Sequence, residues 1–353
     1  MALSKILTSS VADTVLQTDR NFIINGDFQC WQRATAATAG VHNTLNTTDR
    51  FGWLLSNDGA VTSEQSTDTP TGTGYSFLLK CTTADTSLAA GQYAGLFHNI
   101  EAQNLQSLQY GSSSAKSITL SFFVKSNKTG TYTVAIYKSG NTGYIIPNEY
   151  TINSANTWEK KTITITPTAG GTSFITASAG ALLNTNALGF QVAFNLAFGS
   201  TFHGTNNTWS SNASHYSTSN AVNWMDSTSN NFYLSQVQLE IGDAATPFEH
   251  EDYTTTLTKC RRYYQYLLGN SYFGGFVTYQ GATSYYHQVV PQMRAAPSVT
   301  QYAVRNHSTG ATANANANYS GVDGVNLPMD GAGGVDTHGS HIAQAYIELA
   351  AEV

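Results

Sequence analysis

Five stretches between residues 118 and 241 alternate apolar and polar side chains, and this alternation constrains the fold more than any other feature of the chain. A period of two places the apolar side chains of a β-strand on one face. Clusters of Gly, Asn and Ser separate the stretches, as is typical of antiparallel sheets with one buried face. We therefore expect an all-β chain built around a β-sandwich or jelly roll. The alternating apolar positions are Ile118, Leu120, Phe122 and Val124; Tyr132, Val134 and Ile136; Ile163 and Ile165; Phe190, Val192, Phe194, Leu196 and Phe198; and Tyr233, Val237, Leu239 and Ile241.

Composition bounds the class of protein. A length of 353 residues allows one large or two moderate domains, and 41% apolar residues indicate a globular chain. Only 11% of the residues are charged, so Thr, Ser, Asn and Gln must supply the polar surface. The net charge of −6 lacks the basic footprint of a nucleic-acid-binding protein. No apolar run approaches the roughly 20 residues that a membrane-spanning helix needs, so no membrane insertion is expected.

The cysteines and the first residues bear on the compartment. Cys30, Cys81 and Cys260 are far apart and form no CxxC motif, so we expect reduced structural thiols and no zinc or redox site. Residues 1–20 lack the continuous apolar core of a signal peptide. Both features favour assembly inside a cytoplasm.

We divide the chain into three parts: an arm over residues 1–20, a jelly-roll β-sandwich over 21–250, and a smaller C-terminal β domain over 251–353 that begins with a short helix. The helix is predicted over residues 255–267, with Thr254 or Thr255 as its N-cap. A single apolar face follows from the spacing of Leu257, Cys260, Tyr264 and Leu267.

No arrangement of reactive side chains indicates an enzyme. The sequence contains no GxSxG, HExxH, P-loop or EF-hand pattern. The charged run 249–252 follows Pro247 and is more typical of a solvated turn than of an acid–base pair. His338 and His341 provide two imidazoles without a third ligand, which does not make a closed metal site.

The best candidate for recognition is the long loop of residues 199–230, which has little periodicity. It carries His203, Trp209, Tyr216 and Trp224 among Asn, Ser and Thr. Sugar recognition uses flat aromatic faces together with polar side chains that fix hydroxyl groups, so these four residues are candidates for glycan or subunit contacts. The alternative, which stays open, is that the aromatic residues fasten the loop to its own sheet.

Residues 21–28, NFIINGDF, resemble the opening of jelly-roll carbohydrate-binding modules. In that family the first and last strands pair near a structural calcium ion. The resemblance makes Asp27 the candidate calcium ligand, although Gln29 stands where the family has an acidic residue. No other cofactor is expected.

The stretch 231–264 ends a strand at QLEIG, passes TPF and reaches CRRYY. This order resembles a junction in tailed-phage structural proteins, and residues 291–297, PQMRAAP, resemble the strand that follows it there. The resemblance implies a non-enzymatic virion protein assembled in the host cytoplasm. Its expected role is a tail-fibre or receptor-binding subunit that contacts host surface glycans and attaches to other virion proteins through residues 1–20.

Self-association is also expected. The dense aromatic cluster of residues 263–286 exceeds what a small domain readily hides, and closed symmetry would cover it. Resemblance to phage fibres favours a homotrimer. The candidates for its interface are Leu257, Tyr264, Leu267, Phe273 and Phe276.

Three alternatives remain from the sequence. A capsid-decorating or head-fibre protein would use the same modules. A glycan depolymerase would need paired carboxylates in a groove, whereas the acidic residues here are scattered. A carbohydrate-binding module of a cellular enzyme would not explain the second β domain.

Overall fold

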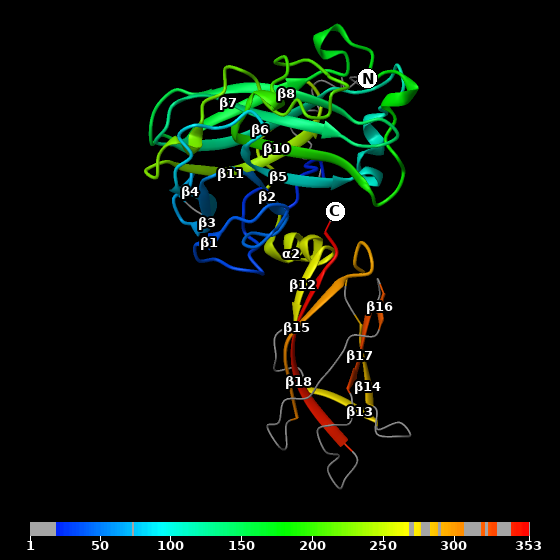
Figure 1. Cartoon of the computed structure of the whole chain (residues 1–353). Coiled ribbons are helices and arrows are strands. Elements are labelled where there is room, and N and C mark those ends of the chain that lie inside the picture. Colours follow the sequence, from blue (N-terminus) through cyan, green and yellow to red (C-terminus); the bar gives the residue numbers. More distant parts are fainter. Residues whose placement is uncertain are drawn as a thin grey trace, which may run out of the picture.

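The computed structural model describes residues 19–72, 74–267, 272–276, 283–288, 291–306, 319–321, 324–329 and 340–352. Two antiparallel sheets form a β-sandwich, and one short α-helix lies toward the C-terminal end of the described residues (Figure 1). The expected all-β sandwich is confirmed. Among the described residues, no helix has the length and apolar character needed to span a membrane.

One sheet has six strands and the other has five, and neighbouring strands in both are antiparallel. In spatial order, the six-stranded sheet contains β1 (Thr38–Ala39), β3 (Ala60–Ser66), β4 (Ser76–Thr83), β11 (Asn231–Ile241), β6 (Ile118–Ser126) and β9 (Glu159–Ile165). The five-stranded sheet contains β2 (Phe51–Ser56), β5 (Tyr93–Glu101), β10 (Leu188–Phe198), β7 (Gly130–Lys138) and β8 (Tyr144–Ile152). Short 3-10 helices are η1 (Ala102–Leu108), η2 (Ala169–Gly171), η3 (Ser178–Gly180), η4 (Ser200–Phe202) and η5 (Trp224–Asp226).

The core lies between the two sheets and is filled by the alternating apolar residues. Phe122 of β6 and Phe194 of β10 are fully buried and meet edge to face across the sandwich, with ring centroids 5.1 Å apart. Burying such a side chain contributes roughly 1.5–3 kcal/mol. The period-two pattern therefore predicted the inner face of β6, and that of β10 as far as Leu196, correctly. A register shift between Asn195 and Ala197 turns Phe198 to the outer face, so its predicted place on the inner face was wrong.

Strand β11 departs from the predicted alternation. A β-bulge between Ser235 and Gln238 inserts one extra residue, and Gln236 adopts a positive φ of 50°. Because the extra residue shifts the side-chain phase, Val237 faces the core while Tyr233 is half-exposed on the outer face. The prediction that Tyr233 shares the buried face of Val237 was wrong for this reason.

The segment Asn21–Phe28 lies beside β11 at this bulge. Phe22 N–H donates to the Leu239 carbonyl at 2.9 Å, and Val237 N–H donates to the Gly26 carbonyl at 2.8 Å. A Cβ atom at position 26 would collide with the carbonyl oxygen of Val237, so only glycine fits there. The segment NFIINGDF and the strand that ends at QLEIG, which are far apart in the sequence, thus lie side by side.

The helix, α2 (Tyr253–Arg261), is shorter than predicted and starts from a different cap. The side chain of Asp252, rather than a threonine, accepts from Thr255 N–H at 3.1 Å. The chain then enters β12 (Tyr264–Leu267), which pairs with β18 (Ser340–Ala350). Tyrosine-rich sequence suits a strand, and the ladder with a distant segment ends the helix early. Tyr264 and Leu267 are therefore strand residues and share no helical face with Leu257 and Cys260.

The remaining described strands lie beyond α2. β12, β13 (Tyr272–Phe276) and β15 (Ser298–Asn306) all pair with β18, while β14 (Thr283–Gln288) pairs with β17 (Gly324–Met329) and β17 with β16 (Tyr319–Gly321). They form an elongated unit below the sandwich in Figure 1. Beyond Tyr266, side chains are described only for residues 291–298 and 350–352. The predicted arm falls almost entirely on residues outside the described ones, and the domain boundaries stay a prediction.

Candidate functional site

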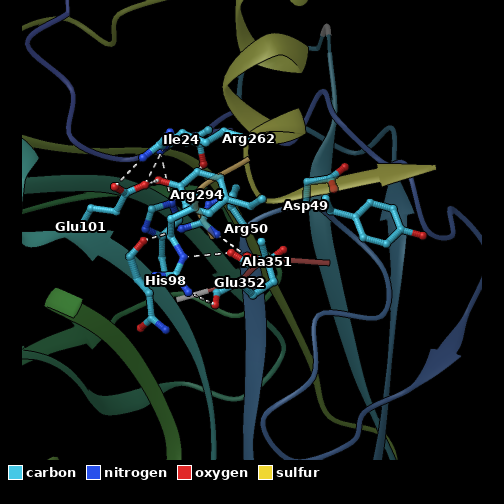
Figure 2. A network of polar contacts seen from close by, with 12 residues as sticks. Ile24, Asp49, Arg50, His98, Glu101, Arg262, Arg294, Ala351 and Glu352 are labelled. Atoms are coloured by element: carbon cyan, nitrogen blue, oxygen red, sulfur yellow. Dashed lines mark hydrogen bonds and ion pairs between the residues drawn. The ribbon is translucent and has the colours of Figure 1, made fainter. Parts of the chain in front are cut away.

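A network of ionic contacts joins α2 and the C-terminal residues to one edge of the sandwich (Figure 2). Its first centre is Glu101, the fully buried last residue of β5. Arg262 donates to both carboxylate oxygens of Glu101 at 2.9 Å, and the Tyr263 hydroxyl donates at 2.6 Å. Burial alone would raise the pKa of Glu101, but these hydrogen bonds hold it below the ordinary value.

The second centre is Arg50, which is 1% exposed and has a positive φ of 73°. Its guanidinium carbon lies 3.4 Å from the centroid of the Tyr263 ring, and the guanidinium pairs with Glu352. It also donates to the Asn99 carbonyl at 2.6 Å. Burial and the nearby Arg50 charge hold the pKa of His98 well below its ordinary value, so His98 is neutral.

The third centre is Arg33, which bridges Asp49 at 3.0 Å and Glu352 at 2.8 Å. Its guanidinium carbon lies 3.6 Å from the centroid of the Tyr264 ring. Tyr264 is only 3% exposed, so it packs within its own chain and offers no surface to a second subunit. This corrects its assignment to a trimer interface.

Arg294 completes the network from the PQMRAAP segment. It donates to the carbonyls of Ala351 at 2.9 Å and Glu352 at 2.7 Å. The two motifs that resembled phage proteins, CRRYY and PQMRAAP, therefore both supply contacts at this junction. Its acidic groups face cations of the same chain, which suits a structural role.

A different set of residues lies on the outer face of the five-stranded sheet. Gln191 of β10 stands opposite Asn99 of β5 on one side and Tyr137 of β7 on the other. Gln191 Nε2 donates to Asn99 Oδ1 at 3.1 Å, and the Tyr216 hydroxyl donates to Gln191 Oε1 at 3.0 Å. We call Asn99, Tyr137, Gln191 and Tyr216 the amide–tyrosine patch.

The patch is uncharged and partly open to solvent. Tyr137, Gln191 and Tyr216 are half-buried, and Asn99 is 7% exposed. Burial raises the pKa of Tyr216 to about 12, so its hydroxyl stays neutral at ordinary pH. Amides beside tyrosine rings can fix sugar hydroxyl groups while the rings contact sugar C–H groups.

Aromatic stacking holds Tyr216 in place. Its ring stacks on Phe198 with centroids 5.8 Å apart, and Phe198 stacks on Tyr93 at 5.6 Å. The loop of residues 199–230 is further fastened to the sheet by Ser217, whose hydroxyl lies 3.0 Å from that of Thr133. The loop therefore covers part of this outer face, and Tyr216 is the loop residue that joins the patch.

Two of the four loop residues singled out from the sequence are core residues. Trp209 is 1% exposed and Trp224 is 0% exposed, and their indole N–H groups donate to the Thr166 and Asn231 carbonyls. They cannot stack on a sugar, because their faces pack inside the sandwich. The structure thus favours the alternative that they fasten the loop to its own sheet. His203 is half-buried, with Nε2 at 3.0 Å from the Phe198 carbonyl oxygen.

The sequence singled out Tyr216 but not its neighbours in the patch, Asn99, Tyr137 and Gln191, and the role of Tyr216 stays a prediction. A signal was present at Tyr137, an aromatic residue beside the inward-facing Ile136 and therefore at an outward position of its strand. The remaining trimer candidates stay predictions: Leu257 is half-buried, and the side chains of Leu267, Phe273 and Phe276 lie outside the described ones.

Asp27, the calcium candidate, lines a small hollow with Glu249 and Glu251. Burial raises its pKa, and the Gln29 amide donates to it. Glu249 accepts from three backbone N–H groups, those of residues 19, 20 and 21, and Glu251 pairs with Lys259. Calcium prefers six to eight oxygen ligands. Because Glu249 and Glu251 already bind these N–H groups and Lys259, the described residues that line the hollow do not fit a calcium site.

Comparison with solved structures finds similar sandwiches at low identity. The tailspike protein 4 enzymatically active domain of bacteriophage CBA120 aligns with 13% identity and a TM-score of 0.30 over 63% of this chain and 22% of its own. A putative sugar binding protein from Bacteroides thetaiotaomicron aligns with 14% identity and a TM-score of 0.34 over 63% of this chain and all of its own. The family 11 carbohydrate-binding module from Clostridium thermocellum aligns with 14% identity and a TM-score of 0.28, over 61% and 99%.

No family model and no curated protein matches the sequence. The chain spans about a fifth of the length of the tailspike domain. At these TM-scores the likenesses decide neither the fold nor the function, and both rest on the residues of this chain.

Proposed function

We propose that this chain binds a polysaccharide through the amide–tyrosine patch and serves, without enzymatic activity, as a tail-fibre or receptor-binding subunit of a tailed-phage virion. The observation that supports binding is the hydrogen-bonded series from Tyr216 through Gln191 to Asn99 on the outer face of the five-stranded sheet. The sequence resemblance at residues 231–264 supports the virion role.

The chemistry of the patch favours a neutral glycan over a charged ligand. The patch contains two amides and two tyrosines and no ionised side chain. An amide can both donate to and accept from a hydroxyl group, which matches the mixed character of sugar hydroxyls. Hydrogen bonds of this kind contribute about 0.5–1.5 kcal/mol each, so weak binding strengthened by several copies in a particle is expected.

The direct test is affinity electrophoresis of the purified chain against a panel of soluble bacterial polysaccharides. We expect Gln191→Ala and Tyr216→Phe to weaken binding to the recognised polysaccharide by about tenfold, which corresponds to about 1.4 kcal/mol. Tyr75→Phe is the matched control, because Tyr75 is an exposed tyrosine outside the patch. Unchanged binding in both patch variants would exclude the patch as the site.

Three further measurements test the virion role, the absence of hydrolysis and the oligomeric state. Immunogold labelling of phage particles should place the chain on the tail, whereas labelling of the head would favour a capsid-decorating or head-fibre protein. Incubation with the recognised polysaccharide should release no new reducing ends, because we propose no hydrolysis. Light scattering of the purified chain tests the expected trimer.

A further inference from the structure

Three buried side chains with metal-binding atoms converge where α2 packs on the sandwich. Cys30 and Cys260 are 0% exposed, and Asp49 is 1% exposed. One ligand atom from each lies within 4.8 Å of the others. The sequence suggested no zinc site because the cysteines are far apart along the chain. The fold brings two of them together, since Cys260 lies in the last turn of α2 beside the loop that holds Cys30.

We propose that Cys30, Asp49 and Cys260 form a binding site for one borderline-soft divalent cation, with Zn²⁺ as the expected ion. Two thiolates and a carboxylate are ligands that Zn²⁺ accepts, whereas Ca²⁺ and Mg²⁺ prefer oxygen alone. With Zn–S bonds of about 2.3 Å, two sulfurs of a tetrahedral site lie about 3.8 Å apart. The observed spacing accommodates that geometry.

The charges around the site balance when the cation is bound. The Arg33 guanidinium lies 3.0 Å from Asp49 Oδ1. The two charges of the ion together with that of Arg33 match the three negative charges of two thiolates and one carboxylate. A buried cation therefore leaves no uncompensated charge. Binding would release the two thiol protons to solvent.

The ligands are already held in place by neighbouring groups. Gln32 N–H donates to Asp49 Oδ2 at 2.8 Å, and the Asn25 side chain accepts from Cys30 N–H at 2.8 Å. Such supporting hydrogen bonds orient metal ligands before the ion arrives. Three protein ligands leave the fourth tetrahedral position for a water molecule.

A cation at this position would fasten three separate segments to one another: the loop after Phe28, the residues before β2, and α2. It would act beside the ionic network of Figure 2, in which Asp49 also takes part. The ion would thus stabilise the attachment of the C-terminal unit to the sandwich, independently of any glycan bound at the amide–tyrosine patch.

Cobalt provides a spectroscopic probe of the site. The full chain is purified under reducing conditions, stripped with a chelator and titrated with Co²⁺. We expect one equivalent to bind with thiolate-to-cobalt charge-transfer absorption, and Zn²⁺ to displace it. C30S and C260S should lose this absorption. C81S should retain it, because Cys81 is also buried but lies in β4 outside the cluster.

A second measurement uses the unaltered chain, in case the cysteine variants fail to fold. Zn²⁺ should raise the Tm of the stripped protein and release two protons per ion in weak buffer, whereas Mg²⁺ should do neither. Three outcomes would overturn the proposal. They are the absence of charge-transfer absorption in the reduced wild type, its persistence in both C30S and C260S, and equal Tm shifts with Zn²⁺ and Mg²⁺.

Discussion

Two regions of one strand, β5, use opposite chemistry on the same outer face. Asn99 belongs to the uncharged amide–tyrosine patch, and Glu101, two residues further on, is the buried centre of the ionic junction. Only 11% of the chain is charged, yet the junction gathers charged residues from distant segments: Arg33, Asp49, Arg50, Glu101, Arg262, Arg294 and Glu352. At the junction, charged side chains hold two parts of the chain together, while the partly open patch contains no charged side chain.

The largest effect should come from the loop that covers the outer face. Trp209→Ala removes a fully buried indole and should lower the free energy of unfolding by about 3–5 kcal/mol. Trp158→Ala is the control, because Trp158 is half-buried on the outer side. Losing its hydrogen bond to Asp68 and its contact with Tyr233 should cost about 1–2 kcal/mol. Urea unfolding followed by tryptophan fluorescence measures both. Equal effects would mean that the loop is not part of the core.

The junction should be the next most sensitive region. Arg262→Ala leaves Glu101 buried without its bidentate partner. Because the Arg262 side chain is 33% exposed, water replaces part of the lost contact, and we expect a loss of about 2–3 kcal/mol rather than the 3–5 kcal/mol of a fully buried pair.

Arg261→Ala, at the exposed neighbouring position, should change stability by about 0.5 kcal/mol or less. Limited proteolysis at residues 243–252 gives a second readout, because a loosened junction exposes this connection. If both arginine variants behave alike, the Glu101 contact does not hold the junction.

Acid should weaken the junction without affecting the patch. The folded-state pKa of Glu101 lies below its ordinary value of 4.5, so its contribution is fully present above that pH and is lost as the pH falls through the folded pKa. Asp49 acts in the opposite direction, since burial raises its pKa.

Thermal unfolding of Glu101→Gln from pH 7 to pH 3 isolates the Glu101 contribution. The variant should show a smaller loss of Tm on acidification than the wild type, because it has no carboxylate at this position to become protonated. Parallel pH profiles would contradict the assignment.

The smallest effect on stability should come from the patch itself. Tyr216→Phe removes one hydrogen bond to Gln191 and should cost about 0.5–1.5 kcal/mol. The stacking on Phe198 remains, so chemical denaturation should show an almost unchanged fold while polysaccharide binding weakens. A loss as large as that of Trp209→Ala would make Tyr216 a structural residue.

The sequence predicts the sandwich well because period-two burial is a local property of each strand. Phe122 and Phe194 could be assigned to the core without knowing which strands pair. The bulge at Gln236 appears in the sequence only as one break in that period, because Leu234 and Val237 are three residues apart instead of two.

Contacts between distant segments were the least predictable. The end of α2 depends on the pairing of β12 with β18, and the partner of Arg262 lies 161 residues away in β5. The sequence motif at residues 260–264 was recognisable, but its partner was not. For the same reason Asn99 and Gln191, brought together by pairing of β5 and β10, could not be placed in one patch beforehand.

The ion pair between Arg50 and Glu352 spans 302 residues. During synthesis at about 5–20 residues per second, position 352 is added about 15–60 seconds after position 50. Until then, Arg50 of the nascent sandwich lacks its carboxylate partner, Glu352. A product that stops before residue 352 never gains this ion pair. The surroundings of Arg50 are therefore complete only after residue 352 has been added and has packed against the sandwich.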